Sequence, residues 1–356
     1  MTSVPRTRTV RAVLRDLCRD GRGPVLLFVA AGWFFSLGVR LAYPTLLPYV
    51  RAEFGLGLTA AGLLITTLWT AYALGQFPGG ILRDRLGDRA VLTASTALSA
   101  VTLLAVALSR TAPTLFAATM LFGFGTALFG TARFTVLADI YEDREGVAIG
   151  ITMAAGNVGN VVLPVAATLI ATALAWRVGL GLAVPFFAVF ALGLWRVVPG
   201  RTVEAGGALS AHTLARIRSG VTRRPVIVAT GALLLVHFAW QGFTGFYPTY
   251  LVERKGLDPN VAAAVYGLFF ASGIVVQPVA GAGSDRYGPR PTLLAAIGAA
   301  VVALAVLPFA GSLPALAALT VLASSVLGVV PVGNAYLVAA LPADVEGGGL
   351  GLVRTV

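Results

Sequence analysis

Two arginines lie inside apolar stretches of the sequence, where a charged side chain is costly. Arg40 stands in "LGVRLAYPTLLP" and Arg133 in "FGTARFTVLADIY". A charge at bilayer depth indicates function by default, and a guanidinium holds a carboxylate or phosphate through two parallel hydrogen bonds. Two guanidinium groups that face one cavity therefore favour an anionic solute. The alternative for both is a structural role: Arg133 pairs with Asp139, or the side chains reach the membrane interface.

Other polar and aromatic side chains in the apolar stretches are candidates for lining the same cavity. In "AAGNVGNVVLP", Gly156, Asn160 and Pro164 are four residues apart, so they share one helix face and predict a tight, polar-lined, slightly kinked helix. For Trp240 and Gln241 the alternative is helix packing or an aromatic belt at the membrane interface. The candidate lining residues are Tyr43, Asn157, Asn160, Trp240, Gln241, Tyr247, Gln277 and Asn334.

Few groups in these stretches are able to carry a proton. The middle of each apolar stretch is free of Asp and Glu, and Asp139 stands near the end of its stretch. His237 is a second candidate, although a lone histidine among apolar neighbours is more often a packing residue. Cys18 is the only cysteine, and the two histidines are far apart in sequence, so we expect no disulfide, metal site or cofactor.

The composition indicates a membrane protein. Of 356 residues, 57% are hydrophobic and 12% are charged, against about 25% charged in a soluble domain. The net charge of +11 comes from arginines between long apolar runs, without the continuous basic stripe and interleaved aromatics of a nucleic-acid-binding protein. A role in binding nucleic acid is therefore excluded.

Ten apolar stretches are long enough to cross a bilayer as helices, because each holds about 20 residues. "GGGLGLVRTV" resembles the start of an eleventh. Arginines concentrate before the first stretch and in every second connection, which predicts a cytoplasmic N-terminus. The expected spans are 25–49, 59–79, 91–109, 114–138, 147–174, 179–197, 225–250, 259–280, 291–309 and 313–339.

The long polar connection 198–224 divides the chain into two parts. We predict a cytoplasmic segment 1–23, which is either a surface helix or a disordered basic tail, a six-helix lobe 24–197, the cytoplasmic loop 198–224, and a second lobe 225–356 of four helices and the start of a fifth.

The two parts repeat one another at a separation of 201 residues. "GGILRDRLGDR" matches "AGAGSDRYGPR", and Gly55-Leu56 and Glu145-Gly146 match Gly256-Leu257 and Glu346-Gly347 at the same separation. Matched spans have equal polarity, so the repeat is parallel. On this repeat the second lobe is expected to lack roughly its last 43 residues, which makes the chain a fragment or a truncated product. The matched loop positions are Gly80, Asp84, Arg85, Gly87 and Arg89, and Gly281, Asp285, Arg286, Gly288 and Arg290.

The doubled G-x-x-x-D-R-x-G-x-R loop, together with two six-helix lobes in a parallel repeat, resembles the major facilitator superfamily. The resemblance implies an all-α membrane protein, not an enzyme, whose lobes alternate access to a site near the bilayer midplane. It also implies that Asp84, Arg85 and Arg89 form part of a cytoplasmic latch against an eleventh helix, although a plain positive-inside anchor is the alternative. We further expect Gly80 to permit close helix approach and Asp84 to favour the N-terminus of the next helix.

Arginines in the first and fourth helices resemble the organic-anion branch of that superfamily, the anion:cation symporters. In this chain Val39 replaces the acidic residue that often precedes the first of them. The resemblance implies secondary transport of a small organic anion by a monomer in the inner membrane, possible coupling to protons or sodium, and no cofactor. The alternatives are an exporter of lipophilic compounds, against which Leu163 before Pro164 argues, and a membrane protein that does not transport.

Overall fold

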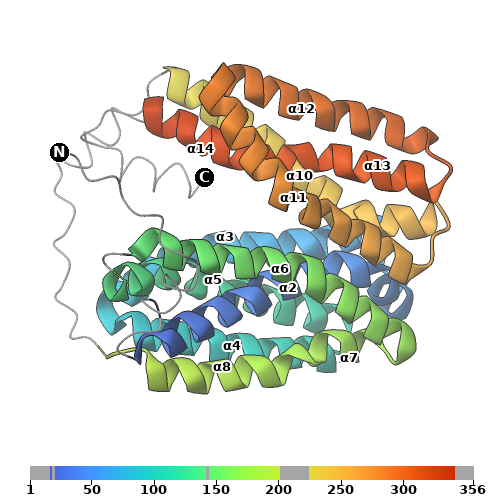
Figure 1. Ribbon diagram of the computed structural model, residues 1–356. Helices are drawn as coiled ribbons and strands as arrows, with labels where there is room; N and C mark the ends of the chain where they lie inside the picture. The colour runs from blue at the N-terminus through green and yellow to red at the C-terminus, as the bar shows by residue number, and fades with distance from the viewer. Residues whose placement is uncertain (1–16, 18–20, 142–143, 201–223, 341–356) are drawn as a thin grey trace, which may run out of the picture. The chain divides into compact units, whose positions relative to one another are not determined.

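The computed structural model describes Leu17 and residues 21–141, 144–200 and 224–340. Every regular element of this part of the chain is a helix, which confirms the all-α prediction (Figure 1). The α-helices are α2 (Gly23–Phe54), α3 (Leu58–Leu86), α4 (Asp88–Leu108), α5 (Ala112–Ile140), α6 (Glu145–Ala173), α7 (Trp176–Gly181), α8 (Ala183–Val197), α10 (Arg224–Glu253), α11 (Pro259–Tyr287), α12 (Pro289–Val306), α13 (Leu313–Ala323) and α14 (Val329–Ala340). Two 3-10 segments, η3 (Leu307–Phe309) and η4 (Ser324–Gly328), follow α12 and α13.

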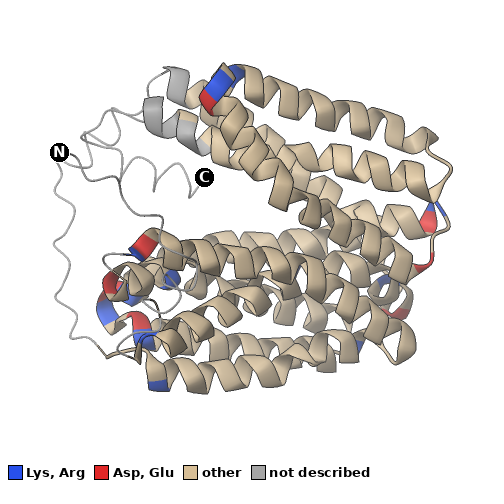
Figure 2. Ribbon diagram, viewed as in Figure 1, with Lys and Arg blue, Asp and Glu red and all other residues tan. Residues whose placement is uncertain are grey.

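Ten segments of the described chain are long and apolar enough to cross a membrane, and they coincide with the ten predicted spans. Several are longer than predicted, because hydrogen bonding within a helix continues past the end of the apolar stretch. Helix α3, for example, runs to Leu86, whereas its apolar stretch was expected to end at residue 79. Lys, Arg, Asp and Glu gather at the helix ends (Figure 2).

The chain divides into two compact units that differ from the predicted lobes. Unit 1 comprises Met1–Leu37, Thr67–Gly159 and Gly181–Ala205, and unit 2 comprises Gly38–Thr66, Asn160–Leu180 and Gly206–Val356. The boundaries fall within the continuous helices α2, α3 and α6. The division into lobes 24–197 and 225–356 stays a prediction.

The core of unit 1 contains apolar residues of α2, α5 and α8. Val29 and Trp33 of α2 pack in one buried cluster with Phe129 and Val136 of α5 and with Leu194 of α8. Serine and threonine hydroxyls inside the helices are satisfied by backbone carbonyls, as when Ser95 of α4 donates to the carbonyl of Gly125 at 2.6 Å. The arrangement fixes α5, which carries Arg133.

The backbone repeats with the same separation of 201 residues as the sequence. Gly87 separates α3 from α4 with φ 81°, and Gly288 separates α11 from α12 with φ 88°. Gly55 and Gly256 form a second pair, with φ 63° and 67°. Both signature loops are therefore single-glycine breaks between two helices, in a backbone region that side chains with a Cβ disfavour.

Replacing Gly87 by alanine is expected to lower the free energy of unfolding by about 1–3 kcal/mol, because its backbone, with φ 81° and ψ 160°, lies in a region that is populated almost only by glycine. Gly80→Ala is the matched control in the same loop, since Gly80 is helical and no described atom lies within 4 Å of a Cβ there. Thermal unfolding of the two purified variants in detergent measures the difference. Equal melting temperatures would contradict the prediction.

Two local expectations need correction. The close helix approach lies at Gly75 and Gly79, where an added Cβ would be 2.6 Å from the Ala127 Cβ and 3.3 Å from the Leu128 Cα. These two glycines are four residues apart and face α5, whereas Gly80 is turned away by one helical step of about 100°. Asp84 lies in the last turn of α3, and it is Asp88 that occupies the first turn of α4.

Candidate functional site

Arg40 lies near the middle of α2, in unit 2, and is 0% exposed. Its neighbours in the chain, Val39, Leu41 and Tyr43, are buried as well. Helix α2 packs here against α6, since the hydroxyl of Thr45 donates to the carbonyl of Pro164 at 3.4 Å. The guanidinium is thus enclosed by protein at a depth where the helix is otherwise apolar.

Arg133 lies on α5, in unit 1, and is 6% exposed. Its guanidinium carbon is 3.4 Å from the centre of the Trp33 ring and 4.2 Å from that of Phe134. Its Nη1 donates to the carbonyl of Gly130 at 2.9 Å. Stacking on an aromatic face attracts a cation and fixes the plane of the guanidinium, but does not cancel its charge.

Trp33 is a site residue that the sequence analysis missed. It is buried, and Gly156 of α6 makes room for it, because a Cβ at Gly156 would be 2.3 Å from the indole Nε1. Seven residues separate Trp33 from Arg40, so both side chains lie on one face of α2. This seven-residue spacing is the sequence feature from which Trp33 could have been predicted as a site residue. Because Arg40 and Arg133 belong to different units, the structure does not place them together, and their shared site stays a proposal.

The other candidate lining residues divide between the units. Asn157 is half-buried in unit 1; in unit 2, Tyr43, Asn160 and Tyr247 are buried and Trp240, Gln241 and Gln277 are half-buried. The side chain of Asn334 is outside the described residues. Gly156, Asn160 and Pro164 are all buried on α6, which agrees with the predicted shared face. Fully buried Tyr266 of α11 was not predicted, because its stretch resembles any apolar helix.

The two candidate proton carriers, Asp139 and His237, are both exposed in the structure. His237 contacts the Trp240 ring at a centroid distance of 4.9 Å. Within the described residues no group of three His, Cys, Asp or Glu side chains is suited to a metal ion. The coupling roles stay predictions.

The signature loop of the first half is held by contacts within unit 1. Arg83 forms an ion pair with its neighbour Asp84, and Arg85 is exposed. The guanidinium of Arg89 lies 4.0 Å from the centre of the Trp195 ring on α8. In the second loop Asp285 and Arg286 are exposed. The start of the expected eleventh helix, from Glu346, is outside the described residues, so the latch is untested.

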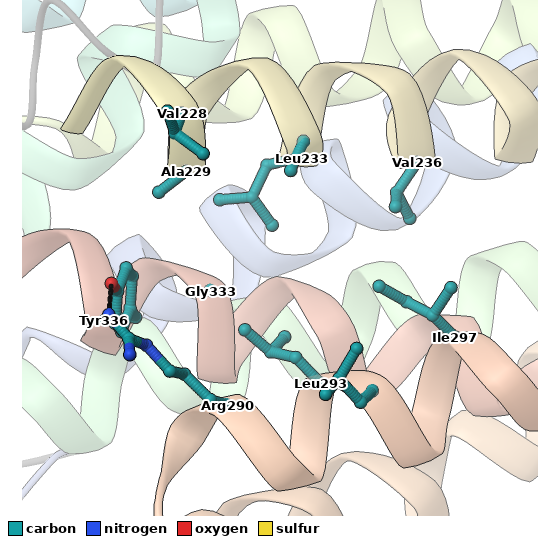
Figure 3. A pocket seen from close by; sticks show the side chains of 11 residues that line it. Val228, Ala229, Leu233, Val236, Arg290, Leu293, Ile297, Gly333 and Tyr336 are labelled. Atoms are coloured by element: carbon teal, nitrogen blue, oxygen red, sulfur yellow. Dashed lines mark hydrogen bonds between the residues drawn. The ribbon is translucent and has the colours of Figure 1, made fainter. Parts of the chain in front are cut away.

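An apolar groove of about 640 Å³ lies in unit 2 between α10, α12 and α14 (Figure 3). Leu233, Leu293 and Ile297 line it, and at one end Arg290 donates to the Tyr336 hydroxyl at 3.3 Å. Most of the lining has no group that would orient a polar solute.

The residues of the first half that correspond to the groove's lining indicate what kind of surface the groove is. Three of its lining residues, Ala229, Val236 and Arg290, correspond at 201 residues' separation to Phe28, Phe35 and Arg89. In unit 1 those residues contact α8, where Phe28 and Phe35 lie 6.2 and 5.3 Å from Phe190 and Arg89 stacks on Trp195. We therefore interpret the groove as a helix-packing surface.

Comparison with known families decides the identity. The family model described as Major Facilitator Superfamily matches residues 28–356. The chain belongs to the major facilitator superfamily. It is accordingly a multi-pass membrane protein of a transporter superfamily and not an enzyme. The solved structure of a bacterial homologue of the human lysosomal transporter Spinster, inward-facing and unoccupied, has a TM-score of 0.80 at 17% identity and covers 94% of this chain and 79% of its own.

Several characterised superfamily members are similar to this chain. The hexuronate transporter of Bacillus subtilis is 23% identical over 270 residues, which are 74% of this chain and 64% of the relative. The nitrite extrusion protein of the same organism is 28% identical over 220 residues, 62% of this chain and 54% of the relative. The multidrug transporter MdfA of Yersinia pestis is 26% identical over 301 residues, 80% and 69% respectively. The chain spans less than two thirds of the first two relatives.

Proposed function

We propose that this superfamily member takes part in secondary transport of a small organic anion by alternating access between two lobes. The observation that carries the proposal is the burial of two guanidinium groups, Arg40 and Arg133, inside helices that are otherwise apolar. An intramembrane charge is retained against its cost where it serves a solute or ion. A carboxylate bound by an arginine regains the hydrogen bonds that it loses on leaving water.

The relatives support an anion but differ in its kind. Hexuronate is an organic carboxylate, whereas nitrite is a small inorganic anion. Stacking on Trp33 covers one face of the Arg133 guanidinium and fixes its plane, and the N–H groups of a guanidinium donate in that plane, which suits a planar carboxylate. With this function we also propose the cytoplasmic N-terminus, an inner-membrane location, a monomer, a latch at Asp84, Arg85 and Arg89, and coupling to a proton or sodium ion.

An exporter of lipophilic compounds is the second candidate, and the similarity to a multidrug transporter favours it. Such a cavity binds by packing and does not need Arg40. The third alternative is a membrane protein that does not transport, and no structural feature favours it.

Binding by the purified chain separates these candidates. Isothermal titration calorimetry in detergent is run with glucuronate, nitrate and the lipophilic cation tetraphenylphosphonium. We expect saturable binding of glucuronate and weak or no binding of tetraphenylphosphonium. Binding of the cation alone would instead establish the exporter. Binding of none of the three would overturn transport of organic anions by this chain.

Trp33→Leu is expected to weaken glucuronate binding by about 3- to 10-fold, because a desolvated cation–π contact contributes about 1–2 kcal/mol and here holds the Arg133 guanidinium in place. Trp33→Phe keeps an aromatic face and should retain most of the affinity. Trp195→Leu on α8 is the matched control, since it removes a similar contact from Arg89 of α4. The same loss of affinity in the Trp33 and Trp195 variants would contradict the role of Trp33.

A further inference from the structure

Several buried polar atoms of unit 2 have no hydrogen-bond partner among the described residues, including Thr230 Oγ1, Trp240 Nε1 and Thr249 Oγ1. Two others belong to α6 and α11. They are the hydroxyl of Tyr266 on α11, in a residue that is 0% exposed, and the amide oxygen Oδ1 of Asn160 on α6, in a residue that is 7% exposed. A polar group buried without a partner costs about 1–3 kcal/mol. Native structures satisfy nearly all such groups, so an exception indicates a ligand, water or ion.

The contrast with Tyr247 shows that another buried tyrosine hydroxyl of the same unit does have a hydrogen-bond partner. Tyr247 of α10 is 2% exposed, and its hydroxyl is hydrogen-bonded to that of Thr320 on α13. The Tyr266 ring, by comparison, packs edge-to-face on Phe270 at 5.2 Å, a contact that a phenylalanine would make as well. Packing therefore accounts for the ring of Tyr266 and leaves its hydroxyl unexplained.

Contacts between helices put these two residues at one level with Arg40. Thr45 and Tyr49 of α2 bond to Pro164 and Thr172 of α6, so the two helices run parallel and Arg40 lies within about one turn of the level of Asn160. A Cβ at Gly267 of α11 would be 3.4 Å from the Val161 carbonyl oxygen. Tyr266 and Asn160 each precede this contact by one residue, so each lies within about 1.5 Å of its level along the helix axis, with its side chain turned by about 100° from the contact itself. Three adjoining helices of unit 2 thus carry a cation, a hydroxyl and an amide at similar depth.

We infer that Tyr266 and Asn160 form a neutral subsite beside Arg40, which binds a hydroxyl group of the transported anion. The inference rests on the proposed function. A hydroxyl accepts one hydrogen bond from Tyr266 and donates another to Asn160 Oδ1, so it satisfies both atoms at once. Nitrate and nitrite have no proton to donate to Asn160 Oδ1. The subsite selects a hydroxylated carboxylate over nitrate and over carboxylates without hydroxyl groups.

The test compares two carboxylates of similar size, glucuronate and cyclohexanecarboxylate, by calorimetry on the purified chain. Tyr266→Phe is expected to weaken glucuronate binding by about 3- to 10-fold, the effect of one neutral hydrogen bond with its partner left unpaired, and to leave cyclohexanecarboxylate binding unchanged. Asn160→Ala should lower the glucuronate affinity similarly. In the double variant the two losses should be less than additive, because both residues bind one group.

Thermal unfolding without ligand checks that the tyrosine variant folds. Tyr266→Phe should keep or raise the melting temperature, because it removes an unpaired hydroxyl, whereas Tyr247→Phe should lower it by breaking the bond to Thr320. Equal loss of both ligands in Tyr266→Phe, or no loss of either, would overturn the subsite alone. Failure of the unchanged chain to bind either carboxylate would overturn the proposed function and the subsite with it.

Discussion

Arg40→Gln abolishes measurable glucuronate binding by the purified chain, with an expected fall in affinity of at least about 100-fold. Hydrogen bonds to a charged group contribute about 1.5–3 kcal/mol each, and a guanidinium makes two of them to one carboxylate. The buried position of Arg40 excludes water as a substitute partner. Glutamine keeps a polar side chain but is shorter than arginine and uncharged, so calorimetry reports the loss of the whole guanidinium.

Two further variants separate the effect of the Arg40 charge from the effect of losing any arginine. Arg40→Lys keeps the charge as a point donor and should bind more weakly than the unchanged chain but better than Arg40→Gln. Arg110→Gln removes an exposed arginine between α4 and α5 and should leave the affinity unchanged. Wild-type affinity in Arg40→Gln, in protein with an unchanged melting temperature, would show that Arg40 has a packing role.

Gly159→Ala is expected to give a large loss of stability, about 3 kcal/mol or failure to accumulate as folded protein. A Cβ at Gly159 of α6 would lie 2.3 Å from the carbonyl oxygen of Phe34 on α2. That oxygen belongs to the backbone of a helix and does not move aside as the end of a side chain does. Relief requires the two helices to separate, and overpacking of this kind costs about 1–3 kcal/mol or more.

Gly150→Ala is the matched control for Gly159→Ala. It lies in the same helix, and no described atom comes within 4 Å of a Cβ there. Alanine is a better helix former than glycine by about 1 kcal/mol, so Gly150→Ala should hold or raise the melting temperature in detergent. A similar melting temperature for the two variants would refute the close approach of α2 and α6 at Gly159.

The spans and the repeat were predictable because they depend on properties of each segment alone. Hydrophobic length sets where a helix crosses a bilayer, and the separation of 201 residues between the signature loops reappears as matching positive φ angles at Gly87 and Gly288. One position, the glycine of α3 that approaches α5, was nevertheless predicted wrongly. Which of the adjacent glycines 79 and 80 faces α5 depends on how α3 is rotated, and apolar length carries no information on rotation.

A residue of the candidate site was predictable only where its residue type is unusual for an apolar stretch. An arginine such as Arg40 or Arg133 is conspicuous in an apolar stretch. Trp33 and Tyr266 are not, because aromatic residues are ordinary in membrane helices and their roles depend on neighbours in other helices. The stacking of Arg133 on Trp33 joins positions 100 residues apart in the chain.

The sequence by itself thus determined that the chain is a helical membrane protein, that its loops repeat, and that two arginines inside apolar stretches need an explanation. The repeat is visible in the residues themselves, and the other two conclusions follow from the free energy of transferring side chains from water to lipid, to which each segment contributes independently. Tertiary structure alone decided which hydroxyl is satisfied and which is not, at Tyr247 and Tyr266, and which glycines hold helices together. Such properties arise from packing between helices, where a difference of one residue in rotation changes every contact.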